Sequence, residues 1–254
     1  MLYGADLPFG DPSVTALSTT QRAAIAGHWK RRMRSELYVG RAFAAMVPLL
    51  REHGAAPAVL DRLERGAEEE TRHSEICAQL AETYGGESVE RTRIDSVPLP
   101  RFGVGDEDLE TALLVAGMCC VNETVATAWI SACLAAAEEP LAQMANRIHL
   151  HDEIEHARLG WAHLASDAVS DATRRALGPR LPKLLEANAP GWERDDPMLP
   201  AEGVPAQGHL PFEASRRVYA DAVAELVIPG FAHVGVDIGP ATAWLAKRTG
   251  RAAE

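Results

Sequence analysis

Apolar residues return every three to four positions in four long stretches of the first 170 residues, and polar residues fill the positions between them. This period matches one face of an α-helix, so it predicts four long amphipathic helices. Glycine and proline separate the stretches, since glycine favours helix ends and proline suits a first helical turn. The expected helices cover residues 19–51, 57–84, 106–137 and 140–170.

The four helices are expected to form two hairpins. The breaks at His53-Gly54 and Glu139-Pro140 are short, so each joins two antiparallel neighbours. Residues 85–105 form a longer connection that is rich in proline and glycine. About 20 extended residues reach roughly 65 Å, which exceeds the roughly 42 Å length of a helix of about 28 residues. The connection can therefore cross from one end of a helix bundle to the other.

The helical pattern weakens after residue 170. Gly178-Pro179 is expected to interrupt the next helix, and Pro229-Gly230 to end the one after it. Residues 187–212 contain five prolines and are expected to be irregular. The shorter helices are expected over residues 171–186, 213–227 and 240–247.

We predict a single all-α domain over residues 1–254, because 254 residues can build one large core. Within it, residues 19–170 form a four-helix bundle and residues 171–254 form a C-terminal helical extension. No repeat of 20–50 residues that would indicate a solenoid occurs in the sequence.

Charge and cysteine content narrow the class of protein. The net charge of −11 argues against nucleic acid as a partner, because phosphate binding needs a basic face. The four cysteines all fall in helical stretches and make no C-x-x-C pair. Free thiols in a reducing compartment are the best interpretation, so we expect a cytoplasmic protein.

Two segments are considered as signs of secretion or of a membrane span, and neither supports that interpretation. Met1–Pro12 lacks the basic and apolar regions of a secretion signal. Thr111–Ala137 is long and apolar enough to resemble a membrane span, but it carries Asn122 and Glu123 in its middle. We interpret it as a buried bundle helix and expect no membrane partner.

Two Glu-x-x-His pairs carry the first sign of chemistry: Glu70 with His73, and Glu153 with His156. At i and i+3 both side chains share one helix face, so a carboxylate and an imidazole can reach the same cation. Either pair alone is a weak signal, since two surface residues can have this spacing by chance. Their positions on the second and fourth expected helices make them more specific.

The first and third helices each add one carboxylate. Glu36 lies on the apolar face of its helix, and Glu123 is the only acid between residues 111 and 137. A buried carboxylate is normally paired or bound to a metal, because burying it alone is costly. The possible partners without a metal are Arg32 or Arg34 for Glu36, and Asn122 or Thr127 for Glu123.

All these groups are expected at one height. In an antiparallel hairpin, facing residues lie equally far from the turn. Glu36 and its Glu-x-x-His pair are centred on residues 53–54, and Glu123 and its pair on residues 138–139. Four carboxylates and two imidazoles at one depth are the ligand set of di-iron and di-manganese sites in helix bundles. Two dications would balance the four carboxylate charges.

Glu36, Glu70-x-x-His73, Glu123 and Glu153-x-x-His156 resemble the ligands of the ferritin-like di-iron carboxylate superfamily over residues 19–170. His149 lies four residues before Glu153, on the same line along the helix. A histidine at this position resembles the di-iron arylamine N-oxygenases of the p-aminobenzoate N-oxygenase type, in which it gives one iron a third imidazole. The alternative is a core histidine, or one that contacts the metal ligands without binding the metal.

The resemblance implies a ferritin-like four-helix bundle with additional C-terminal helices. It implies two iron ions, with manganese as the other choice. The first two helices would hold one ion through Glu36, Glu70 and His73. The last two would hold the other through His149, Glu153 and His156, with Glu123 as the bridge.

The resemblance also implies an enzyme: a non-haem di-iron oxygenase that uses dioxygen and an external electron donor. Its substrate would be a small (aryl)amine, oxidised to a hydroxylamine or nitro product. Two other functions fit the same ligands. One is a ferritin-like or rubrerythrin-like protein that oxidises iron or scavenges peroxide, and the other is a di-iron hydroxylase that acts on carbon. If the protein is the enzyme, we expect a homodimer. If it is a storage protein, we expect a shell of many subunits.

Overall fold

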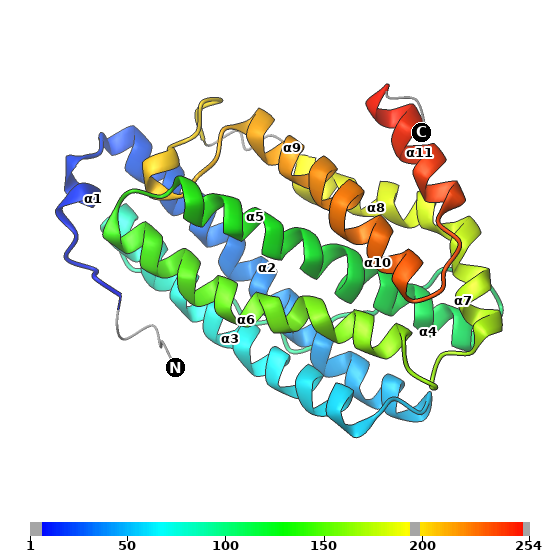
Figure 1. Ribbon diagram of the computed structural model, residues 1–254. Helices are drawn as coiled ribbons and strands as arrows, with labels where there is room; N and C mark the ends of the chain where they lie inside the picture. Colours follow the sequence, from blue (N-terminus) through cyan, green and yellow to red (C-terminus); the bar gives the residue numbers. More distant parts are fainter. Residues whose placement is uncertain (1–6, 194–198, 251–254) are drawn as a thin grey trace.

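The computed structural model describes residues 7–193 and 199–250, and most of these residues are helical. They form no β-strand, and one isolated bridge joins Val204 to His209. The all-α prediction is therefore confirmed. Long helices lie side by side on one side of the molecule, and shorter C-terminal helices cover part of them (Figure 1).

The four predicted long helices are present. Three of them begin and end within one residue of the expected positions, but the fourth ends at Leu164 rather than near residue 170. The third is continuous through a π-helical segment, η2. The elements are α2 (Thr19–Glu52), α3 (Pro57–Gly85), α4 (Glu107–Val115) with η2 (Ala116–Asn122) and α5 (Glu123–Ala136), and α6 (Pro140–Leu164).

Local sequence accounts for the helix ends. Ser18 and Gln21 form a capping box at the start of α2, which satisfies backbone N–H groups that have no helical partner. Pro57 and Pro140 lie in the first turns of α3 and α6, where no N–H is needed. Gly86 ends α3 with a φ of 72°, a conformation that favours glycine.

The long helices pack as the two predicted hairpins require. Helix α2 packs along α3, and α6 packs against α3, η2 and α5. The connection between α3 and α4 crosses from one end of the long helices to the other (Figure 1). Arg41 on α2 holds it by donating a hydrogen bond of 2.8 Å to the Ile94 carbonyl.

The C-terminal extension is more helical than predicted. Residues 187–193, expected to be irregular, continue α8, because Ala189 is buried against the core while Pro190 lies late in the helix. Pro229 does not end the preceding helix, because α9 continues through η5 into α10 without a gap and its neighbours Ile228 and Phe231 are buried in the core. The elements are α7 (Asp171–Leu177), η3 (Gly178–Arg180), α8 (Leu181–Glu193), α9 (Phe212–Ala222), η5 (Val223–Val227), α10 (Ile228–His233) and α11 (Gly239–Thr249). The short α1 (Pro12–Ala16) and η4 (Pro205–Gln207) complete the described helices.

Two hydrophobic clusters make up the core, and a polar layer lies between them. Along α2, residues 25–33 belong to one cluster and residues 43–50 to the other. The same change occurs along α3 and α6. Glu36 on α2, Glu70 on α3 and Glu153 on α6 are buried at the change. The fold therefore holds charged side chains inside the protein at one level.

Among the described residues, one helix is long and apolar enough to cross a membrane, the continuous Glu107–Ala136. Of its most apolar window, 67% is buried inside the molecule. It lies against α6 on one side and against α8 and α9 on another. The prediction of a buried core helix is confirmed.

Gly160 allows α6 to approach η2 closely, so Gly160→Ala tests this packing. A Cβ atom there would lie 2.7 Å from Cys119 Cβ and from Cys120 Sγ. We expect Gly160→Ala to lower the free energy of unfolding by about 1–3 kcal/mol because the helices must separate. Gly191→Ala is the matched control, since nothing lies within 4 Å of its Cβ. It should leave stability unchanged or raise it by about 0.5–1 kcal/mol. Urea unfolding followed by circular dichroism measures both, and equal stabilities would contradict the close contact.

Candidate metal centre

Six of the predicted ligands gather in one buried layer, which we call the Glu/His cluster. None of them exceeds 8% exposure. They come from all four long helices, so the hairpin geometry brings them to one height as expected. The members are Glu36, Glu70, His73, Glu123, Glu153 and His156.

The cluster contains two overlapping groups of four ligands, each close enough to hold a metal ion. In each group, one ligand atom per residue lies within 4.8 Å of the others. We call the first group, with Glu36 and His73, the first position, and the second, with Glu123 and His156, the second position. Both groups contain Glu70 and Glu153. The carboxylates common to both groups thus come from the two Glu-x-x-His pairs, and Glu123, which the resemblance implies as the bridge, belongs to the second group alone.

The local structure of each helix aims these side chains inward. The i, i+3 spacing puts Glu70 with His73, and Glu153 with His156, on one face. The π-helical segment η2 ends directly before Glu123 and changes the rotation of the helix at that residue. Thr127 donates a hydrogen bond of 3.0 Å to the Glu153 carbonyl, which ties α5 to α6 at this level.

Several ligand atoms are buried without a hydrogen bond. Among the described residues these include Nδ1 of both imidazoles and one oxygen of each shared carboxylate. They face one another: His73 Nδ1 lies 3.5 Å from Glu70, and His156 Nδ1 lies 3.1 Å from Glu70 and 3.4 Å from Glu153. Two ligands about 2.1 Å from one cation lie about 3.0–3.4 Å apart. The orphaned atoms therefore fit the coordination of metal ions.

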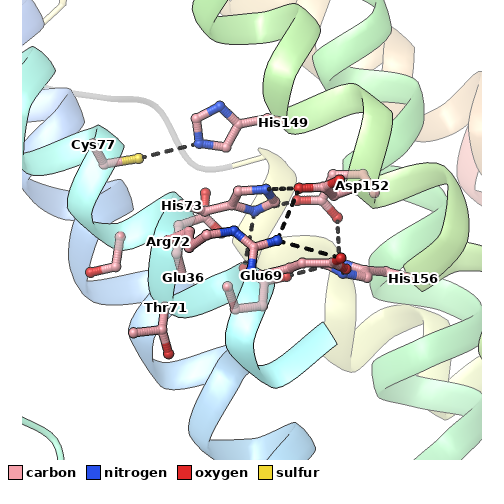
Figure 2. Close-up of polar contacts among 12 residues, drawn as sticks. Glu36, Glu69, Thr71, Arg72, His73, Cys77, His149, Asp152 and His156 are labelled. Atoms are coloured by element: carbon pink, nitrogen blue, oxygen red, sulfur yellow. Dashed lines mark hydrogen bonds and ion pairs between the residues drawn. The ribbon is translucent and has the colours of Figure 1, made fainter. Parts of the chain in front are cut away.

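Two further acids orient the imidazoles, and neither was expected from the sequence. His73 Nε2 lies 3.2 Å from Asp152, and His156 Nε2 lies 3.0 Å from Glu69. Each acid reaches the imidazole on the opposite helix, and Arg72 lies beside both acids (Figure 2). A carboxylate on Nε2 fixes the tautomer and leaves Nδ1 to bind a metal. The signal was present in the sequence as an acid directly before each Glu-x-x-His pair.

Without a cation, the imidazoles balance the carboxylates. Burial opposes the charge on His73, but Asp152 and Glu70 raise its pKa to about 10. The pKa of His156 is also raised well above its usual value by Glu153, Glu69 and Glu70, against the effect of burial. Burial also opposes the charge on Glu70, but the two imidazoles lower its pKa below the usual range. The metal-free cluster thus holds protons on its nitrogens.

Glu123 and Glu36, the carboxylates that belong to only one group each, have pKa values shifted in the opposite direction from that of Glu70. Burial raises the pKa of Glu123 well above its usual value, and Glu153 and Glu70 raise it further. Burial also raises the pKa of Glu36 to about 7, although Arg32 favours the charged form. Asn122 Nδ2 lies 3.2 Å from Glu123 Oε1, so one of the polar partners considered for Glu123 from the sequence contacts its carboxylate.

Glu36 pairs with Arg32, one of the two arginines considered as its partner from the sequence. Arg32 donates two hydrogen bonds to it, of 3.0 and 2.7 Å, and both go to Oε1. This ion pair therefore leaves the second carboxylate oxygen to the cluster. The Arg32 guanidinium lies over the rings of Trp29 and Trp129, at 5.1 and 5.6 Å from their centroids.

His149 lies apart from the position the sequence led us to expect. It belongs to neither group of four; its Nε2 is 3.7 Å from Cys77 Sγ (Figure 2). The reason is its spacing, since seven residues, about 10.5 Å of helix, separate it from His156. It lies beside His73, with ring centroids 4.5 Å apart. Burial, His73 and Arg32 lower the pKa of His149 well below its usual value, so the ring is neutral.

Three other residues on these helices lie outside the cluster. His151 is exposed, and Tyr38 is 43% exposed. His163 is buried in a separate small pocket with His53 and Asp108. The four cysteines are free and buried, as predicted.

A cavity of about 640 Å³ reaches the carboxylates of the Glu/His cluster. Its walls come from α2, α5, α8, α9 and residues 199–210. Four carboxylates of the cluster line it. Aromatic rings line it as well, from His28, Trp129, Trp192, His209 and Phe212. The cluster is therefore buried yet open to a molecule of moderate size.

No known protein family, curated protein or solved structure matches this chain in comparisons of sequence and fold. The interpretation of the cluster therefore depends on its own geometry.

Metal binding should release protons and strengthen as the pH rises. Cations must displace the protons of His73 and His156, because the raised pKa values keep both imidazoles charged at neutral pH. The affinity for each cation is expected to rise about tenfold per pH unit for each displaced proton. Calorimetry in buffers of different ionisation enthalpy counts these protons.

Asp152→Asn provides the check on this prediction. It removes one of the acids that raise the His73 pKa, so it should reduce the protons released by the first position and flatten the pH dependence there. An affinity that does not change with pH in the unmodified protein would contradict the imidazole ligands.

Proposed function

We propose that this chain is a ferritin-like di-iron protein whose four long helices form the metal-binding bundle. The observation that carries the proposal is the pair of overlapping buried groups that share Glu70 and Glu153. Two cations held close together need shared carboxylates, and four carboxylates balance two dications. The unsatisfied Nδ1 atoms of His73 and His156 support the same assignment.

The ligands divide between two cations. Glu36 and His73 would hold the first, Glu123 and His156 the second, and Glu70 and Glu153 would bridge them. Carboxylate oxygens with one imidazole per ion suit iron, and manganese is the other choice. If His149 adds a third imidazole, its place beside His73 favours the first cation rather than the second.

We propose further that the protein is an oxygenase. Bound iron would supply the activation of dioxygen. The cavity supports an enzyme because a path for iron ions alone does not require about 640 Å³ lined by aromatic rings. Trp129, Trp192 and Phe212 offer flat apolar surfaces to a ring, and the four carboxylates line the same cavity. A small arylamine with its nitrogen toward the cluster fits this arrangement.

The chain's own residues would prepare the site. Arg32 keeps Glu36 oriented through Oε1, and Asp152 and Glu69 keep both imidazoles turned to the cations. Buried walls on the other side of the cluster exclude bulk water. Transfer of one oxygen atom to the amine, with reduction of the other to water, consumes two electrons and two protons, and the protons come from solvent. An external donor must supply the electrons, and we propose a cytoplasmic homodimer as the working form.

Metal analysis of two α6 variants tests the shared carboxylate. The unmodified chain should retain about two iron ions after anaerobic loading and dialysis. Glu153→Ala should retain less than about one, because both positions lose a ligand. Glu155→Ala is the matched control, since Glu155 lies on the same helix but pairs with Arg62 and Arg158 on the surface. Equal iron content in the two variants would contradict the assignment.

Oxygen reactivity separates the enzyme from an iron-storage protein. The reduced, iron-loaded chain should consume dioxygen while its iron stays bound at about two ions per chain, and an arylamine should speed the consumption. Oxygen electrode measurements with and without the amine, combined with mass analysis of products, provide the readout. Uptake of many further iron ions as an oxidised mineral would favour storage instead.

A further inference from the structure

Three buried groups on three helices meet beside the first position. They are Glu36 on α2, Cys77 on α3 and His149 on α6, with one ligand atom from each within 4.8 Å of the others. Cys77 and His149 are fully buried. Figure 2 shows the Cys77–His149 contact separate from the contacts of His73, Asp152 and His156. Among the described residues, none of the other cysteines belongs to such a group.

His149 is oriented so that a nitrogen lone pair faces the thiol. Its Nδ1 lies 2.8 Å from the Ala145 carbonyl, which can only accept, so Nδ1 carries the proton. Nε2 is therefore unprotonated in the neutral ring and points to Cys77 Sγ at 3.7 Å. A backbone carbonyl on one imidazole nitrogen is the usual arrangement when the other nitrogen binds a metal.

The distance between the two atoms suits a shared cation. With metal–sulfur and metal–nitrogen bonds of about 2.3 and 2.05 Å, two ligands of a tetrahedral ion lie about 3.6 Å apart. The donors also differ from those of the Glu/His cluster, because sulfur replaces one of the carboxylates. Thiolate with imidazole and carboxylate selects zinc or cobalt over the harder cations.

We propose that Glu36, Cys77 and His149 form a separate site for a thiophilic divalent cation such as Zn²⁺. On binding, the Cys77 thiol gives its proton to solvent and the thiolate becomes the sulfur ligand. The thiolate and the Glu36 carboxylate balance the dication, and Arg32 stays paired with Glu36 through Oε1. A fourth ligand would come from the cavity that Glu36 lines.

Sharing of Glu36 makes this site an alternative to the first iron position. A zinc ion on Cys77 and His149 draws Glu36 away from Glu70 and His73, so the first position loses one of its four ligands. Zinc should therefore lower iron loading from about two ions per chain toward one. The thiolate site can be tested apart from the proposed di-iron function, because Cys77 and His149 lie outside both groups of four and only Glu36 is common to the two proposals.

Cobalt titration of the metal-free full-length chain tests the site, since a thiolate bound to Co²⁺ gives a charge-transfer band in the near ultraviolet. The unmodified chain should develop this band with the first equivalent of cobalt. Cys77→Ala should lose it, and the matched control Cys120→Ala, another fully buried cysteine, should keep it. His149→Ala should weaken cobalt binding about tenfold or more. No band in the unmodified chain, or a band that survives Cys77→Ala, would overturn the proposal.

A second measurement needs no variant, in case Cys77→Ala does not fold. X-ray absorption of the unmodified chain with one equivalent of zinc should find one sulfur about 2.3 Å from the metal. A shell of only nitrogen and oxygen would refute the site. Iron analysis keeps the two proposals distinct: zinc–sulfur bonding without iron binding supports this site alone, and two bound irons without zinc–sulfur bonding support the di-iron function alone.

Discussion

Four carboxylates held together in a hydrophobic interior are the constraint on which the rest of this structure depends. Burial of one unpaired carboxylate costs several kcal/mol, and like charges at short range add to it. In the protein without a cation, protonated His73 and His156 and the guanidinium of Arg32 supply the balance. Cations that replace the protons would relieve the same strain, so the charge balance and the proposed metal chemistry have one origin.

The surroundings make the two positions unequal. The first position lies beside Arg32, Cys77 and His149, which add a fixed cation, a thiol and a third imidazole. The second lies beside Asn122, with Phe43 packed edge-on against the ring of His156. The rate of cation exchange should therefore differ between the first and the second position. This asymmetry connects the proposed oxygenase with the proposed zinc site, since both depend on how Glu36 is shared.

Much of the helical scaffold and the ligand layer could be predicted because each depends on distances along one helix or one hairpin. The bounds of α2 and α3 follow from apolar period and from Pro57, Gly54 and Gly86. The height of Glu36 and Glu123 follows from counting back to a turn. The continuation of α8 past Pro190, and of a helix through Pro229, could not be predicted, because burial against the core outweighs local propensity there.

The sequence by itself determined which helices form and which residues share their inner faces, because the 3.6-residue period and the i, i+3 spacing are local. Only the tertiary structure decided that Glu70 and Glu153 belong to both groups of four. It also decided that Asp152 and Glu69 each reach the imidazole on the opposite helix, and that His149 faces Cys77. These outcomes depend on the rotation of each helix about its axis and on its distance from its neighbours. Both are fixed by side-chain packing between helices, such as the approach at Gly160, which no spacing along the chain encodes.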